Sequence, residues 1–316
     1  MTVALTANHH LSEVQHLLVK SGKKNSLQTF TLAPGIELSY YTMYEENLSL
    51  HHQPFSHVME INYCHSGRVG WKMKNGFSVY LGPGDYSIHT MEVCADSKLS
   101  LPNKYYEGFT ICIDLNMLTG QPPELLKDAG ITGEMLLKKY CSGDRLSSFS
   151  GNEETNAIFG GFYNQPEAYA SSYRKLKVLE LLLYLAKSEP ASQKHLGEYQ
   201  AEQIALIRQI HKQLLSDLGK RITIEELSKQ YLINTTTLKN IFKAVYGTSI
   251  AAHIKEHRME YAANLLLGTN ESVADIAGAV GYDSQSKFTS AFKDAYQVTP
   301  REYRKLHTDM AAARPR

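Results

Sequence analysis

Two stretches near the C-terminus carry side chains of the kinds that can read the edges of DNA bases. Asn and Gln can form paired hydrogen bonds with adenine, a Thr methyl group can contact the thymine methyl, and Ser or Thr can donate or accept. Lys ammonium groups beside such a set can neutralise phosphates. The predicted DNA-binding residues are Thr235, Thr236, Thr237, Lys239, Asn240 and Lys243 in the first stretch, and Gln285, Ser286, Lys287, Thr289, Ser290 and Lys293 in the second.

These two stretches occupy the same place in two similar helical patterns. Residues 224–243 and 273–293 each show a short amphipathic helix, a tight turn and a second amphipathic helix. Asn234 and Ser284 stand just before the second helices and suit the N-cap position. The pattern is that of a helix-turn-helix. One polar helix face is common on any soluble helix, but two such units in tandem favour a DNA reader.

A third helical pattern joins the two units. Residues 249–267 form a helical pattern closed by Gly268, and about 19 helical residues span about 28 Å. Successive major grooves on one face of DNA are about 34 Å apart. One chain can therefore place both second helices in adjacent grooves of double-stranded promoter DNA. Arg258, on the joining helix, is predicted to be a structural or backbone-contacting residue rather than a base reader.

Residues 205–305, about a third of the chain, resemble the AraC/XylS family of bacterial transcription regulators. The similarity rests on RMEYAANLL at 258–266, SVADIAGAVGYDSQSKFTSAFK at 272–293 and TPREYR at 299–304. Many members of the family carry Arg where this chain has Asn240, which argues against a guanine contact there. The resemblance implies base contacts at Thr236, Asn240, Gln285, Ser286 and Ser290.

The same resemblance implies the rest of the architecture. Members of the family often carry an N-terminal jelly-roll sensor followed by helices that dimerise, and an activator of this kind has RNA polymerase as a partner. The resemblance to the family as a whole does not identify the effector. Residues 35–41, GIELSYY, look loosely similar to a subgroup that senses siderophores.

The N-terminal half shows strand patterns that agree with a sensor of this type. Between residues 28 and 115 there are about nine short runs, including one at 92–95, and Asn75-Gly76 is a hairpin signal. The turn Gly82 to Asp85 resembles the corresponding turn of a cupin barrel. We therefore predict an α+β chain with a cupin-like β-barrel, or jelly roll. Such a barrel is either filled by side chains or encloses one small molecule, so an effector in the barrel is predicted, with its binding residues unknown.

Several histidines and one glutamate in this region raise the alternative of a cupin-type metalloenzyme or metal sensor. Cupin enzymes hold a metal with a His-x-His pair, a following Glu and a later His, but this chain has no His-x-His. Alternation along a strand also puts His57 and Asn62 on opposite faces, so the ligands are not expected to converge. We predict neither an enzyme nor a bound metal or cofactor. The candidate ligands are His51, His52, His57, Glu60, His65 and His89.

The four cysteines, Cys64, Cys94, Cys112 and Cys141, form no CxxC pair. In a reducing compartment such residues are typically small buried hydrophobes rather than disulfides. We therefore predict that these cysteines are buried and form no disulfides. The alternative is a thiol sensor that uses Cys64 or Cys94.

Helical patterns follow the strands at 124–129, 133–141, 153–163 and 166–187. Apolar residues recur at helical spacing in the last of these, and this stripe serves either dimerisation or packing on the chain's own barrel. We predict a sensor domain over 1–187 (barrel about 28–115, helices about 124–187), a polar linker over 188–200 and a DNA-binding domain over 201–307 with units at about 222–246 and 272–296. The predicted dimerisation residues are Leu176, Leu179, Leu182 and Leu183.

Composition agrees with this division. From residue 201 onward the chain has 16 Lys and Arg against 12 Asp and Glu, a net charge of +4, whereas residues 1–200 have a net charge of −3. A basic C-terminal part is consistent with nucleic-acid binding. No apolar run reaches the length of about 18 residues that a membrane helix needs, and residues 1–11 lack a signal-peptide pattern. We predict a cytoplasmic homodimer that acts as a ligand-responsive, sequence-specific transcription activator without a membrane partner.

Overall fold

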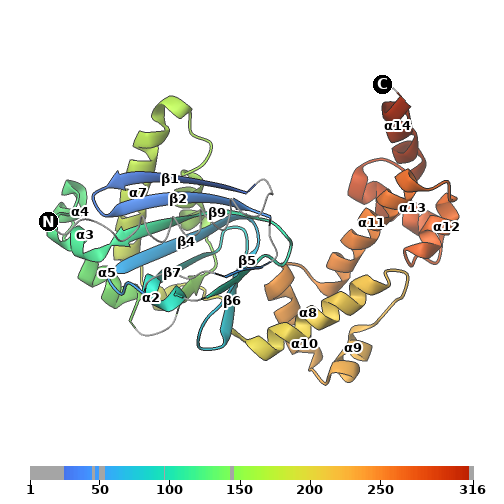
Figure 1. The fold of residues 1–316 in the computed structure, drawn as a ribbon, viewed down its shortest axis with the longest axis horizontal. Helices are drawn as coiled ribbons and strands as arrows, with labels where there is room; N and C mark the ends of the chain where they lie inside the picture. The colour runs from blue at the N-terminus through green and yellow to red at the C-terminus, as the bar shows by residue number, and fades with distance from the viewer. Residues whose placement is uncertain (1–24, 45–46, 50–53, 96, 143–145, 313–316) are drawn as a thin grey trace. The chain divides into compact units, whose positions relative to one another are not determined.

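The computed structural model of the chain describes residues 25–44, 47–49, 54–95, 97–142 and 146–312. The metal-ligand candidates His51 and His52 lie outside these ranges. The chain divides into two compact units, residues 1–201 and residues 202–316. Figure 1 draws the first from blue to yellow and the second from yellow to red.

The first unit contains two β-sheets in which the paired strands are antiparallel. One has the order β1-β2-β9-β4-β7-β10 and the other the order β11-β6-β5-β8-β3. The strands are β1 (Ser26–Ala33), β2 (Ile36–Met43), β3 (Asn47–Ser49), β4 (Val58–Gly67), β5 (Val69–Lys72), β6 (Phe77–Leu81), β7 (Tyr86–Thr90), β8 (Lys98–Ser100), β9 (Tyr106–Asp114), β10 (Ser147–Phe149) and β11 (Tyr199–Gln200).

The prediction of a closed barrel is wrong, because the strands form two separate sheets that each end in edge strands. The chain leaves the larger sheet after β4 and enters the smaller one at β5. Gly67 makes this corner with φ +74°, and a Cβ atom there would lie 2.2 Å from the carbonyl oxygen of Tyr105. A register shift between Cys64 and Ser66 precedes it. Strands that switch sheets at a bulge or bend in this way build a two-layer structure.

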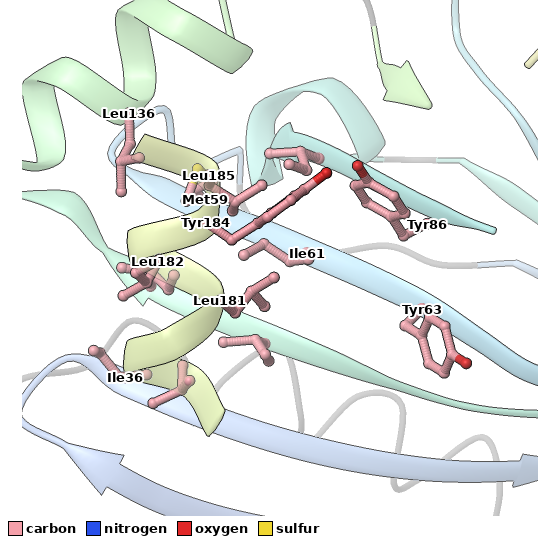
Figure 2. Packing of buried hydrophobic residues seen from close by; sticks show 14 of the residues in the cluster. Ile36, Met59, Ile61, Tyr63, Tyr86, Leu136, Leu181, Leu182, Tyr184 and Leu185 are labelled. Atoms are coloured by element: carbon pink, nitrogen blue, oxygen red, sulfur yellow. The ribbon is translucent and has the colours of Figure 1, made fainter. Parts of the chain in front are cut away.

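Helices cover one face of the larger sheet. The helices predicted after the strands are confirmed as α4 (Glu124–Asp128), α5 (Gly133–Tyr140), α6 (Glu153–Gly160) and α7 (Glu167–Lys187), and α3 (Leu115–Gly120) precedes them. Figure 2 shows Leu181, Leu182 and Leu185 of α7 beside Met59 and Ile61 of β4, all within one buried apolar cluster.

The other face of the larger sheet packs against the smaller sheet. Tyr41, Met43 and Cys64 from the larger sheet share a buried cluster with Trp71 and Leu99 from the smaller one. The order of layers is therefore helices, larger sheet and smaller sheet. In β4, Ile61 faces the helices, and strand alternation turns its neighbours Glu60 and Asn62 toward the smaller sheet.

Two local predictions are corrected. Residues 92–95, predicted as a strand, lie in and just after the helix α2 (Met91–Cys94), whose turn closes when the Ala95 N–H donates to the Met91 carbonyl. The segment 188–200, predicted as a linker, contains the 3₁₀ helix η1 (Pro190–Ser192) and β11. Its backbone pairs with both sheets: the Leu196 N–H donates to Ser148 O at 3.0 Å, and β11 pairs with β6. Sheet-edge partners of this kind leave no local sequence signal.

The second unit is built from helices. Its helices are α8 (Ala201–Ser216), α9 (Ile224–Tyr231), α10 (Thr235–Tyr246), α11 (Ile250–Gly268), α12 (Val273–Ala279), α13 (Gln285–Tyr296) and α14 (Pro300–Ala312). Among the helices of the described residues, none is both long and apolar enough to cross a membrane.

Candidate nucleic-acid interface

The first helix-turn-helix consists of α9 and α10. Thr223 and Glu226 form a capping box that starts α9, since each side chain bonds to the backbone N–H of the other residue. Leu232 ends α9 in the left-handed conformation, with φ 51°. Asn234 then caps α10, and its Oδ1 accepts from the N–H groups of Thr236 at 2.8 Å and Thr237 at 3.4 Å. The predicted cap at Asn234 is confirmed.

The second helix-turn-helix, α12 and α13, repeats this plan with different residues. Ser272 caps α12 and Ser284 caps α13, where the Ser284 hydroxyl accepts from the Lys287 N–H at 3.3 Å. The predicted cap at Ser284 is confirmed. Gly281 forms the turn with φ +77°. Phe288, Ala291 and Phe292 of α13 are buried, so the opposite face of the helix is turned toward solvent.

Each polar side chain predicted to read DNA lies on the surface of these helices. Thr235, Thr237 and Thr289 are partly exposed. The remaining nine are exposed: Thr236, Lys239, Asn240, Lys243, Gln285, Ser286, Lys287, Ser290 and Lys293. Packing inside the unit uses the opposite faces, where Leu238, Ile241, Phe242 and Val245 of α10 are buried. Both second helices thus offer hydrogen-bonding groups that the fold itself does not use for packing.

Arg258 on α11 contacts the segment that leads into the first helix-turn-helix. Its Nη2 donates to the Lys220 carbonyl oxygen at 3.1 Å, just before α9. Burial lowers the pKa of its guanidinium. Arg258 also borders a hollow of about 330 Å³, with Lys220, Arg221 and Lys255. The last three basic residues were not among the predicted DNA contacts, because they lie outside the second helices.

In the first unit, a buried polar cluster brings together some of the predicted metal-ligand candidates. The Glu60 carboxylate lies 3.1 Å from Cys94 Sγ and 3.8 Å from His89 Nδ1. Cys94 was not among the predicted metal ligands, because the sequence predicted a strand where it lies on the helix α2. His57 and His65 are not part of the group of three possible ligands Glu60, His89 and Cys94.

Hydrogen bonds already engage both ring nitrogens of His89. Nδ1 lies 3.0 Å from Thr90 O, and Nε2 lies 3.0 Å from Asn62 Nδ2. Because Asn62 Oδ1 accepts from Thr110 Oγ1 at 2.6 Å, its amide group faces His89 as a donor. A metal ion bound by His89 would therefore have to displace one of these partners.

The cysteines have the environment of buried hydrophobes. Cys64, Cys94 and Cys112 are buried and Cys141 is partly buried, and all four are free thiols. Burial raises the pKa of Cys64 and that of Cys141 to about 12. It also raises the pKa values of Cys94 and Cys112. Reactive cysteines are those with a lowered pKa, so this environment does not favour the thiol-sensor alternative.

The four leucines predicted to dimerise have different environments on α7. Leu182 is fully buried in the core of the first unit, so its side chain is not available to a partner. Leu179 and Leu183 are partly buried and pack against that core. Leu176 is 56% exposed, together with Tyr169 and Tyr173 on the same helix. The exposed apolar residues of α7 therefore lie in its N-terminal half.

Comparison with known proteins identifies the family. A family model described as "Helix-turn-helix domain" matches residues 227–306. The virulence regulon transcriptional activator VirF of Yersinia enterocolitica is 31% identical over 252 residues, which cover 75% of this chain and 86% of VirF. The transcriptional regulator ExsA of Pseudomonas aeruginosa is 39% identical over 77 residues, 24% of this chain and 28% of ExsA.

Among solved structures, ToxT from Vibrio cholerae aligns with 86% of this chain and 98% of its own, at 15% identity and a TM-score of 0.35. The similarity to VirF extends well beyond the helix-turn-helix units and confirms the family predicted from the sequence. Together with the two capped helix-turn-helix units, it shows that this chain belongs to the AraC/XylS family of DNA-binding transcription regulators.

Proposed function

We propose that this protein activates transcription by inserting α10 and α13 into two adjacent major grooves of promoter DNA. The observation that carries the proposal is the pair of exposed, N-capped second helices joined by the 19-residue helix α11. A helix of 19 residues is about 28 Å long, close to the separation of about 34 Å between successive grooves. The names of VirF as an activator and ExsA as a regulator support this role and a non-enzymatic one.

Within this proposal, the exposed residues divide into base readers and phosphate binders. Asn240 and Gln285 have amide groups suited to adenine, and Thr236, Ser286 and Ser290 can contribute single hydrogen bonds or methyl contacts. Smaller contributions to DNA contacts are proposed for the partly exposed Thr235, Thr237 and Thr289. The phosphate contacts are proposed for Lys239, Lys243, Lys287 and Lys293.

We further propose that the first unit is a cupin-like jelly-roll sensor. The orders β2-β9-β4-β7 and β6-β5-β8-β3 within the two sheets support it, because a jelly roll consists of eight strands in two packed sheets. Its effector is proposed to bind in a cleft of about 300 Å³ beside Tyr40, Tyr163 and Arg174, rather than inside the barrel that the sequence predicted.

The chemistry of this cleft favours a ligand with acceptor oxygens. Tyr163 Oη and Arg174 Nε are buried donors without a hydrogen-bond partner among the described residues, and buried donors normally have one. The Arg174 guanidinium lies 3.9 Å from the ring centre of Phe30, a cation–π contact that holds it beside the cleft. Carboxylate-bearing molecules should raise the unfolding temperature of the full chain, and Arg174→Ala should abolish that shift. Equal shifts from matched neutral molecules would argue against this site.

Dimerisation is proposed through α7, with RNA polymerase as the partner of the DNA-bound form in the cytoplasm. The exposed Leu176 and the partly exposed edges of Leu179 and Leu183 support a paired α7 surface. Two chains would then present four second helices to one promoter. This surface excludes Leu182, whose side chain lies in the core.

A binding assay on DNA flanking the gene for this chain tests the proposal. Fluorescence anisotropy of the full chain should show specific binding that weakens steeply with added salt, because Lys contacts release counterions from the phosphates. Asn240→Ala should weaken specific binding by about 1–3 kcal/mol and leave non-specific binding unchanged. Asn264→Ala on α11 is the matched control. Equal affinity for unrelated DNA at every salt concentration would refute sequence-specific reading.

A further inference from the structure

Three histidines of the second unit converge on one point between two helices. His253 and His257 are one turn apart on α11, so they share a face, and His211 reaches them from α8. His253 Nε2 lies 2.9 Å from His211 Nε2 and 3.2 Å from His257 Nε2. One ligand atom from each of the three rings lies within 4.8 Å of the others.

A carboxylate orients His257, one of the two partly exposed members of the trio. His257 Nδ1 lies 3.1 Å from Glu260 Oε2. Because a carboxylate accepts, Nδ1 carries the proton of the neutral ring, and the Nε2 lone pair then points at His253. Histidines that bind metals are oriented by just such a hydrogen bond from the other ring nitrogen to a carboxylate.

Hydrogen bonding alone does not satisfy this arrangement. An imidazole nitrogen has either one N–H or one in-plane lone pair. His253 Nε2 faces two other Nε2 atoms at once, so a single proton can complete only one of the two pairs. A cation that accepts a lone pair from each ring would satisfy all three atoms together.

Neighbouring aromatic rings hold the trio in place. His211 stacks on Tyr246, with ring centres 4.1 Å apart and planes inclined by 22°. His253 contacts Phe242 edge-on, with ring centres 5.5 Å apart. His253 is buried, whereas His211 and His257 are partly exposed. The rings are thus fixed by packing.

We propose that His211, His253 and His257 form a binding site for a divalent transition-metal ion such as Zn²⁺, with Glu260 as a positioning residue. Three imidazoles and one open position are a known zinc ligand set, and Zn–N bonds of about 2.0–2.1 Å in tetrahedral geometry separate the nitrogens by about 3.3 Å. The distances of 2.9 and 3.2 Å need only small ring movements to reach this value. The open position would take water.

An ion at this point would join α8 to α11 beneath the first DNA-reading helix. Tyr246 and Phe242 belong to α10 and pack against His211 and His253. Metal binding would therefore stabilise the first helix-turn-helix without contacting DNA. The Glu60, His89 and Cys94 cluster is a weaker candidate, since both ring nitrogens of His89 are engaged by protein partners.

Calorimetric titration of the full, metal-free chain with Zn²⁺ tests the site. We expect one equivalent to bind, with affinity lowered at least about tenfold by His211→Gln or His257→Gln, since each change removes one of only three ligands. Glu260→Gln should weaken binding by about 10- to 100-fold. Glu256→Gln, one turn earlier on the exposed side of α11, and Cys94→Ser, in the competing cluster, should leave the affinity unchanged.

Two further measurements keep the test decisive if a variant folds poorly. Circular dichroism of each metal-free variant establishes that its fold matches that of the wild type. The absorption spectrum of the wild-type chain with Co²⁺ should show visible ligand-field bands without the near-ultraviolet charge-transfer band of a thiolate ligand. Absence of binding by the wild type, a thiolate band, or unchanged affinity in both His211→Gln and His257→Gln would overturn the proposal.

Discussion

The guanidinium group of Arg258 lies against the backbone of Gly281: a Cβ atom at Gly281 would come within 2.8 Å of Arg258 Nη2. The same nitrogen donates to the carbonyl oxygen of Lys220, which precedes the first helix-turn-helix. Gly281 forms the turn of the second. One side chain in the joining helix α11 thus contacts the entrance to one DNA-reading unit and the turn of the other.

This contact makes Gly281 sensitive to substitution. Gly281→Ala would put a methyl group 2.7 Å from the Gly219 carbonyl oxygen, next to Arg258, at a residue with φ +77°. Left-handed backbone costs about 1–3 kcal/mol for a residue with a side chain, and the clash adds to that. Denaturant unfolding of the full chain should therefore show a loss of at least about 1 kcal/mol in the second unit.

Gly278→Ala is the matched control. Gly278 lies within α12, and a Cβ there would meet nothing within 4 Å. Alanine in a helix is favoured over glycine by about 1 kcal/mol, so this variant should be as stable as the wild type or more stable. Equal losses of unfolding free energy in both variants would contradict a destabilising clash between Arg258 and a side chain at residue 281.

The capping box of α9 predicts a pH dependence. The Glu226 carboxylate accepts from the Thr223 N–H at 2.7 Å and from its hydroxyl at 2.9 Å, and these bonds hold its pKa below the ordinary value of 4.5. Because the pKa is lowered in the folded state, the stabilisation is present above pH 4.5 and is lost as the pH falls through the folded value.

Hydrogen exchange of the α9 amides measures this effect. Glu226→Gln should lower their protection at pH 7, and the difference from the wild type should shrink below pH 4.5 as the wild-type carboxylate takes up a proton. Glu225→Gln, at the neighbouring exposed position, serves as the control and should leave the profile close to wild type. A difference that stays constant across this pH range would mean that the charge of Glu226 is irrelevant to the cap.

The exposed lysines of the second helices should set the salt dependence of DNA binding. Each phosphate contact adds about 0.9 to the slope of log affinity against log salt, so Lys243→Ala and Lys293→Ala should each reduce that slope by about 1. Both residues are exposed near the C-terminal ends of α10 and α13. Lys127→Ala on α4 is the control, and the same reduction in slope there would rule out local phosphate contacts.

If α7 forms the dimer interface, substitutions at Leu176 and Leu182 of this helix should have different effects. Leu176 is 56% exposed, so Leu176→Glu should leave the unfolding free energy within about 0.5 kcal/mol of wild type while abolishing the dimer in light scattering. Leu182 is fully buried, so Leu182→Ala should cost about 2–5 kcal/mol of stability. A Leu176→Glu protein that remains dimeric would place the dimer surface elsewhere.

Local signals explain why the second unit could be predicted closely from the sequence. Caps at Asn234 and Ser284 and the pattern of α11 depend on residues within a few positions of each other. The arrangement of the first unit could not be predicted in this way. The corner at Gly67 depends on Tyr105, and the segment near Leu196 pairs with β10, which has no strand signal of its own.

The functional clusters show the same limit. His253 and His257 are visible as neighbours on one helix, but His211 lies 42 residues before His253 and joins it only through the packing of α8 on α11. Cys94 similarly reaches Glu60 from 34 residues away. Side chains brought together by tertiary packing cannot be recognised from spacing along the chain.

Selection of binding sites from random double-stranded DNA by the full chain tests the central claim most directly. Two helices in adjacent grooves predict two specified blocks with centres about 10–10.5 base pairs apart. Asn240→Ala should relax one block, and Gln285→Ala should relax the other. A single specified block, or two blocks that both change with either variant alone, would contradict the claim that one chain reads two adjacent grooves through α10 and α13.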